Sequence, residues 1–427
     1  MILPKTNIVI TTVNPIRTSL VRQVNHWLQA ASRLSALDHL ASGNAWHGID
    51  QEMGIALRKS LQHSIDDVVS LAKSITKQLE TATEANELRS IKRSLTQLRD
   101  KYLKAEETIN FYTVAINSRT TPNVAALLRA CDILCVKSMQ ELLQPLGKET
   151  PSVLTYIDKG IGASILKAGL RLWDGNLSPL AAIKVTQHNL FRPTAIIHET
   201  GHQVAHILNW NEELSSALLN NLTNHPKVAS VAFASWSSEI AADAFAFVHT
   251  GYAAVAALHD VVSGAPQQVF AFHANDPHPI SYVRVMLGIE MCRQFYGAGP
   301  WDNLELSFRN DYDINLVNYP SVGLIKMCIQ ALPDAVRIIL KSSYRSFNGN
   351  SLTKIISPER VSPQALQKLE YVAGPALFTS HAWIWRECIK LLALNGYKIG
   401  LGQGDLAPLY KQQEEWMIKL GFAVQLN

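Results

Sequence analysis

The feature that most constrains this chain is the five-residue run from His198 to His202, which reads His-Glu-Thr-Gly-His. Residues four apart lie on one face of an α-helix, so both imidazoles can reach one metal ion at roughly 2.0–2.1 Å. Glu199 points partly to the side, where it can take a proton from a metal-bound water without being a ligand. The apolar, helical context of the run favours a metal site over the alternative, two ordinary helical histidines.

A catalytic zinc ion normally takes three protein ligands and leaves one position for water. Ala205 and Leu208 stand where a metzincin has glycine and histidine, so that branch of HExxH proteins is excluded. Glu239 and Asp243 lie four apart in a second apolar run, Glu-Ile-Ala-Ala-Asp. Two acids on an apolar helix are costly to bury without partners, and a metal and a histidine supply those partners. A solvated acidic edge is the alternative interpretation.

The two motifs together resemble those of the gluzincin zinc metallopeptidases, on HETGH at 198–202 and EIAAD at 239–243. What the resemblance implies is one zinc ion per chain and a set of site residues. These are His198, His202 and Glu239 as ligands, Glu199 as general base, and Asp243 as the group that orients a ligating histidine.

The gluzincin resemblance also implies an edge strand before the motif helix, against which an extended peptide can lie by strand addition. Residues 182–186 alternate apolar and polar side chains as a half-buried strand does. We therefore place the substrate strand at Ile183, Lys184, Val185 and Thr186.

A further segment, Asp-Pro-His-Pro at 276–279, has Arg284 six residues after its histidine. It looks like the His-Pro…Arg stretch of prenyl-protease-type and heat-shock membrane gluzincins. By this likeness His278 or Arg284 helps to hold the site or stabilises the oxyanion, and Tyr282 is an alternative hydroxyl donor. A structural His-Pro turn explains the same residues. Those membrane enzymes carry spanning helices, and no such segment is recognised in this sequence.

The chain as a whole is typical of a folded globular protein, with 427 residues of which 47% are hydrophobic and 17% charged. Apolar residues recur at helical spacing through 61–79 and 88–112, which predicts two antiparallel helices joined by a short turn. We predict a mainly α fold with a small β-sheet. Its regions are a helical N-terminal region at 1–150, a zincin-like core at 151–300 and a helical C-terminal region at 301–427.

Composition also bounds the partners and the compartment. The formal net charge of +4 is too small to indicate nucleic acid or an anionic membrane as the partner. Five scattered cysteines fit a reducing compartment, and the first residues lack the pattern of a secretory signal. Acidic residues interrupt the most apolar stretch, 228–262, so a buried helix is preferred there to a membrane span. We expect a soluble, cytoplasmic protein.

These observations predict a zinc-dependent hydrolase acting on a peptide or protein, with Glu199 as general base. Three alternatives remain from the sequence. A non-catalytic zinc-binding protein would have no need of the carboxylate at Glu199. A helical scaffold or interaction protein would bind no metal. A zinc hydrolase acting on a non-peptide amide would share every residue of the site.

Overall fold

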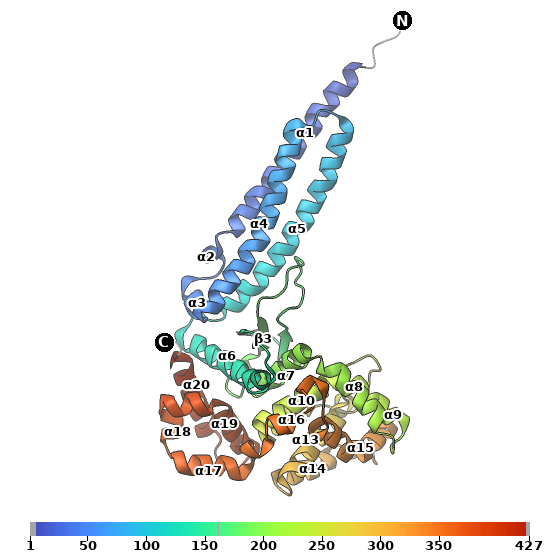
Figure 1. Cartoon of the computed structure of the whole chain (residues 1–427), viewed down its shortest axis with the longest axis vertical. Coiled ribbons are helices and arrows are strands. Elements are labelled where there is room, and N and C mark those ends of the chain that lie inside the picture. Colours follow the sequence, from blue (N-terminus) through green and yellow to red (C-terminus); the bar gives the residue numbers. More distant parts are fainter. Residues whose placement is uncertain (1–5, 161, 424–427) are drawn as a thin grey trace. The chain divides into compact units, whose positions relative to one another are not determined.

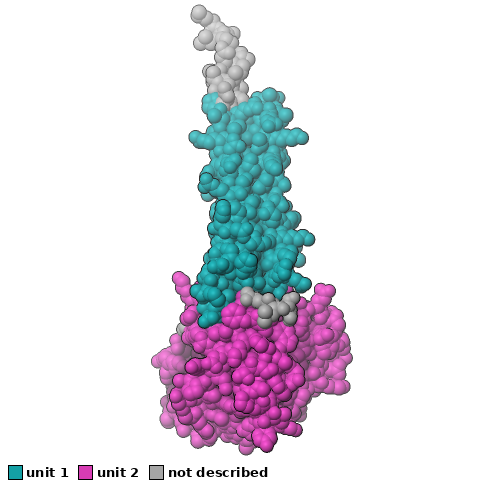
Figure 2. Space-filling view, turned by 90° about the vertical axis from the view of Figure 1, so that its left-hand side faces the viewer, with its two compact units in different colours: residues 1–125, 168–180 teal, residues 126–167, 181–427 magenta. Residues whose placement is uncertain are grey.

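The computed structural model describes residues 6–160 and 162–423, and it is mainly helical with a small three-stranded sheet, as predicted (Figure 1). The chain forms two compact units, which Figure 2 distinguishes by colour. Unit 1 comprises residues 1–125 and 168–180. Unit 2 comprises residues 126–167 and 181–427.

Unit 1 is a bundle of the long helices α1 (Thr6–Leu34), α4 (Gln51–Thr81) and α5 (Ala85–Asn117), with α2 (Leu37–Leu40) and α3 (Gly43–His47) between the first two. The apolar stripes predicted at 61–79 and 88–112 are buried between the helices, which confirms the antiparallel pair. Residues 168–180 return to this unit from the sheet, where Ser178 shares a 2.7 Å hydrogen bond with Tyr112 of α5.

The sheet belongs to unit 2 and has the strand order β1-β3-β2. The strands are β1 (Val153–Ile157), β2 (Ser164–Leu166) and β3 (Ala181–Val185); β1 pairs with β3 in parallel and β2 pairs with β3 in antiparallel fashion. The predicted strand at 183–186 therefore exists, but its position as an edge strand is wrong. It lies between two partners, and β2 is the edge strand that adjoins the cavity described below.

Helices make up the rest of unit 2. The motif helix α7 (Ala195–Leu208) packs most closely on α10 (Ser237–Thr250). The other helices of the chain are α6 (Pro122–Leu143), α8 (Trp210–Asn221), α9 (Lys227–Ser235), α11 (Tyr252–Val262), α12 (Pro266–Val269), α13 (Ser281–Tyr296), α14 (Pro300–Asp311), α15 (Val322–Lys341), α16 (Leu352–Ile355), α17 (Pro363–Ala373), α18 (Ala376–Thr379), α19 (His381–Gly400) and α20 (Ala407–Ala423). Short 3₁₀ turns lie at Gln144–Leu146, Gln187–Asn189, Arg345–Phe347 and Pro358–Val361.

The contact between α7 and α10 depends on a glycine inside the HExxH run. A Cβ added to Gly201 would stand 2.8 Å from the Cα of Ala242 and 3.0 Å from the Cβ of Phe245. No side chain fits at such distances, so glycine allows the two helix backbones to approach. On α10 the small residue Ala242 is at the point of closest approach. The contact brings the two motifs together.

The division into units differs from the three regions predicted at 1–150, 151–300 and 301–427. Most of α6 and all helices after residue 300 share unit 2 with the metal motif. In addition, residues 168–180 leave the core region and join unit 1. The core is therefore larger than predicted, and it is discontinuous in sequence.

The apolar stretch at 228–262 forms parts of three helices inside unit 2. Within the described ranges, no single helix is both long and apolar enough to cross a membrane. Taken together, α9 and α10 reach the necessary length and hydropathy, but a bend of 71° separates them. Most residues of α10 are buried.

Candidate metal centre

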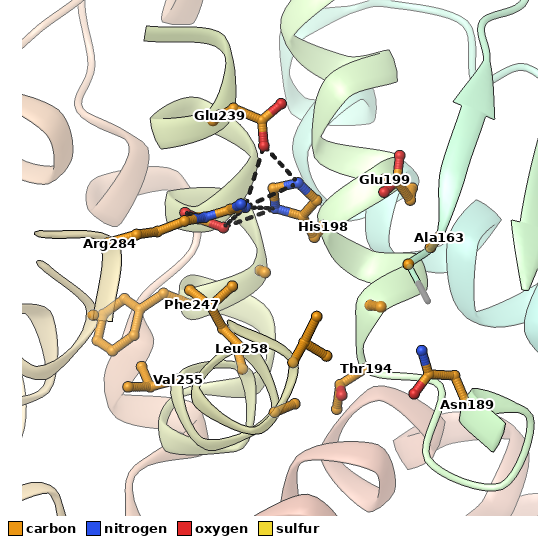
Figure 3. Close-up of a pocket in the computed structure, with 18 of the residues that line it drawn as sticks. Ala163, Asn189, Thr194, His198, Glu199, Glu239, Phe247, Val255, Leu258 and Arg284 are labelled. Atoms are coloured by element: carbon orange, nitrogen blue, oxygen red, sulfur yellow. Dashed lines mark hydrogen bonds and ion pairs between the residues drawn. The ribbon is translucent and has the colours of Figure 1, made fainter. Parts of the chain in front are cut away.

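A cavity of about 820 Å³ in unit 2 is lined by seven of the predicted site residues, His198, Glu199, His202, Glu239, Asp243, His278 and Arg284. Its walls come from α7, α10, α11 and α13 and from the segment around β2 (Figure 3). On one side the cavity has the ionisable side chains of both motifs. Its remaining wall is largely apolar and is formed by Phe247, Val255, Leu258, Leu287 and Met291.

Three candidate ligands converge in this cavity. The Nε2 atom of His198 is 3.3 Å from Oε2 of Glu239, and Nε2 of His202 is 3.2 Å from Oε1 of the same carboxylate. One ligand atom from each residue lies within 4.8 Å of the other two. Around a tetrahedral zinc ion with ligands at roughly 2.0–2.2 Å, neighbouring ligand atoms are about 3.3–3.6 Å apart. The donor types and their spacing thus fit zinc.

Asp243 and Arg284 fix the orientation of His198. Nδ1 of His198 lies 2.8 Å from Oδ1 of Asp243, and a proton on Nδ1 leaves Nε2 free to face Glu239. Arg284 donates to both oxygens of Asp243, at 2.7 and 2.8 Å, and Nη2 lies 3.2 Å from Glu239. Figure 3 shows Arg284 on one side of the His198 ring. Arg284 is therefore brought to the site, as a group that holds the carboxylates.

The charges of this cluster shift the pKa values of its members. Burial alone would lower the pKa of His198, but the carboxylates of Asp243 and Glu239 outweigh it and raise that pKa to about 9. Burial likewise acts to raise the pKa of Asp243, whereas Arg284 and His198 lower it to about 2. The pKa of Glu239 lies well below its ordinary value, because hydrogen bonds from the two histidines outweigh burial. Both acids are therefore ionised at neutral pH.

His202 has a different partner, which the sequence analysis missed. Its Nδ1 lies 3.3 Å from Oγ of Ser238, the residue directly before Glu239 on α10. The Ser238 hydroxyl has the same place beside His202 that Asp243 has beside His198. It can accept a hydrogen bond from Nδ1–H of His202, which leaves Nε2 to face Glu239. A serine directly before the candidate ligand Glu239 has no distinctive sequence pattern, so only the packing of α10 on α7 identifies it.

Glu199 lies apart from the three ligands but in the same cavity. It is 8% exposed, and Figure 3 shows it on the side of His198 that faces Ala163, away from Arg284. Glu199 follows His198 directly on α7, so its carboxylate projects from the helix in a different direction from the two imidazoles. Glu199 therefore lines the cavity without belonging to the cluster of three candidate ligands.

The structure separates the remaining candidates. His278 lines the cavity with a 57% exposed side chain; its Nε2 is 3.6 Å from Oε1 of Glu239, and its Nδ1 pairs with Asp276 at 2.6 Å. Tyr282, by contrast, is 1% exposed and stacks on Phe270 within an aromatic cluster. It is absent from the cavity lining, so the structure does not bring it to the predicted oxyanion position.

The substrate strand predicted from the sequence, 183–186, does not line the cavity. Ile183 and Val185 are buried and Lys184 donates to the carbonyl of Lys159, so these three residues are structural parts of the sheet. Thr186 is buried directly after the strand and, like them, does not line the cavity. The cavity is lined instead by residues of the β2 segment, among them Ala163, Ser164, Ile165 and Lys167. Lys167 was not singled out from the sequence, because a lone lysine after a three-residue strand carries no pattern.

Comparison of the chain with family models, with curated proteins and with solved structures finds no match.

Proposed function

We propose that this chain is a zinc-dependent metallopeptidase that hydrolyses peptide bonds with Glu199 as general base. The observation that carries the proposal is the convergence of His198, His202 and Glu239. The Nε2 atoms of the two histidines lie 3.3 and 3.2 Å from the carboxylate oxygens of Glu239. The carboxylate of Glu199 lines the same cavity without belonging to this group of three candidate ligands. A purely structural zinc site gives no reason for such an additional acid, which argues against the non-catalytic alternative.

In this proposal each residue of the chain has a defined task. Zinc, when bound, would lower the pKa of a water towards about 7 and polarise the scissile carbonyl. Glu199 takes the proton of the attacking water and later delivers it to the leaving amine. Asp243 keeps His198 in the tautomer that binds through Nε2.

His278 is the group best placed to act on the developing oxyanion. Its exposed ring lies at the cavity and approaches Glu239, while Asp276 holds its Nδ1. That hydrogen bond orients the ring; in the protonated imidazolium, which has N–H groups on both ring nitrogens, Nε2–H can donate towards the reacting carbonyl. Arg284 is less available, because both of its donor sides face Asp243 and Glu239.

The edge of β2 supports a peptide as the substrate. Among the described strands, β2 pairs with β3 alone, so its other edge has backbone groups available for an added strand. Ala163 and Ser164 at this strand also line the cavity. The apolar wall formed by Phe247, Val255 and Leu258 suits a large apolar side chain of that peptide.

The expected cytoplasmic location forms part of the same proposal. All five cysteines are free and buried, and none lies in the group of three candidate ligands. Free thiols are the usual state of cysteine in reducing compartments, which supports this location.

The test of the function is a Glu199→Gln variant compared with the wild type on a peptide library, with cleavage followed by mass spectrometry. Glutamine keeps the shape of the side chain but cannot accept the proton. We expect a loss of hydrolysis by at least about 10²-fold with unchanged zinc content. Hydrolysis by Glu199→Gln at the wild-type rate would refute the proposed chemistry.

A further inference from the structure

Lys167 places a positive charge in the cavity without a fixed anionic partner. Its side chain is half-buried and lines the cavity. Within residues 6–160 and 162–423, no carboxylate lies within ion-pair distance of its ammonium group, and no hydrogen bond to that group is found. A half-buried cation is costly to leave unpaired, so a ligand that supplies an anion is favoured at this point.

Lys167 lies at the end of β2, the strand whose free edge is proposed to pair with the peptide substrate. It follows directly after the last residue of β2, and side chains alternate between the two faces of a strand. Ile165 and Lys167 share one face by this alternation and both line the cavity, as do Gly162, Ala163 and Ser164, whereas Leu166 does not. A peptide that pairs with β2 must therefore pass the ammonium group.

The two acids with the largest electrostatic effect on Lys167, Glu239 and Glu199, have other roles. Burial lowers the pKa of Lys167, and the charges of Glu239, Glu199 and Glu212 oppose that effect from beyond ion-pair distance. Glu239 is already shared by two histidines and Arg284. Glu199 is the proposed general base. Neither acid is free to neutralise Lys167 during turnover.

We propose that Lys167 is a specificity-determining residue that binds a carboxylate of the peptide substrate. This inference rests on the proposed function, because it assumes that a peptide lies along β2. The carboxylate comes either from an aspartate or glutamate side chain or from the free C-terminus of the peptide. Both sources present the same anion to the ammonium group, so the experiment must distinguish them.

The experiment measures binding, so that it does not depend on turnover. Zinc-loaded Glu199→Gln protein is used to select from randomised octapeptides, prepared once with free and once with amidated C-termini. We expect enrichment of aspartate or glutamate at one position in both libraries, or recovery of peptides from the free-terminus library alone. Adding Lys167→Met should reduce affinity for the selected peptides about ten- to a hundred-fold, as expected for loss of a charge-assisted hydrogen bond.

Two further variants make the test specific. Lys148→Met removes the same charge from an exposed position outside the cavity and should leave the selection unchanged. Lys167→Glu should reverse the preference towards basic residues, a result that general destabilisation cannot produce. Selection of the same peptides by Lys167→Met, no preference for a carboxylate, or no peptide binding at all overturns the inference. Carboxylate-dependent binding without any hydrolysis by the wild type supports Lys167 and refutes only the proposed chemistry.

Discussion

Replacing Gly201 by alanine tests how the two motif helices create the site. The added Cβ would meet the Cα of Ala242 at 2.8 Å, its carbonyl oxygen at 3.1 Å and the Cβ of Phe245 at 3.0 Å. Two of these three atoms belong to the backbone of α10, so a side-chain rotation cannot relieve the overlap. The helices must move apart by several tenths of an ångström.

The expected effect on stability is a difference between two opposing contributions. Overpacking in a well-packed core costs about 1–3 kcal/mol. Alanine in a helix interior is more favourable than glycine by about 1 kcal/mol. The free energy of unfolding of the metal-free protein should therefore fall by only about 0–2 kcal/mol, and the protein should still fold.

The effect on metal binding should be larger than the effect on stability. His198 and His202 lie on α7, whereas Glu239 lies on α10, so separating the helices directly lengthens the distances between ligands. Metal sites tolerate errors of only about 0.5 Å in ligand position. We expect Gly201→Ala to weaken zinc binding at least about tenfold.

Urea unfolding of the metal-free protein and competition with a chromophoric chelator measure the two quantities separately. Gly323→Ala is the matched control, because this glycine is also helical and its added Cβ would meet nothing within 4 Å. The control should bind zinc as the wild type does and lose no stability. Wild-type zinc affinity in Gly201→Ala would refute the reasoning that links the close helix contact to the metal site.

Three further predictions concern ionisable groups of unit 2. Asp243→Asn should weaken zinc binding about 10–100-fold in the chelator assay, because a neutral amide replaces the carboxylate that orients His198 and raises the basicity of its ring. Burial alone would raise the pKa of Glu141, but His249 and Arg360 lower it to about 2. The ionised carboxylate therefore stabilises the fold at pH values above the ordinary pKa of glutamate, and this stabilisation is lost as the pH falls towards 2. Glu141→Gln should therefore lower the free energy of unfolding by about 1 kcal/mol at pH 7 and by nothing near pH 2, measured by urea unfolding at each pH. His278→Ala should reduce kcat more than it changes KM, whereas a change in KM alone in steady-state kinetics would exclude a role at the oxyanion.

The helical elements and both motifs were predictable because their evidence is local. The apolar spacing at 61–79 and 88–112 places α4 and α5, and the i, i+4 spacing places the two histidines on one face. The acids at 239 and 243 follow the same rule on α10. These patterns suffice to predict which side chains can share a site.

The strands were harder to predict because their pairing is not local. Nothing within residues 183–186 tells whether the strand has one neighbour or two, and the order β1-β3-β2 makes it central. The short strand β2 contains three residues, too few for a recognisable alternation. Lys167 could be recognised only after β2 was placed beside the cavity.

Of the two candidates on α13, Arg284 faces the cavity and Tyr282 does not, for a simple physical reason. Two residues apart on α13, they project about 200° from each other, so both cannot face the same cavity. The ion pairs to Asp243 and Glu239 place Arg284 inside, and Tyr282 then faces the aromatic cluster.

The metal content of freshly purified protein tests the central claim most directly. Elemental analysis should find about one zinc ion per wild-type chain, and Glu239→Ala and His202→Ala should each lose or greatly weaken it. Glu199→Gln should keep its zinc, since Glu199 is not a ligand. A wild-type protein that binds no zinc tightly, even when zinc is supplied, would contradict the account and favour a helical interaction protein.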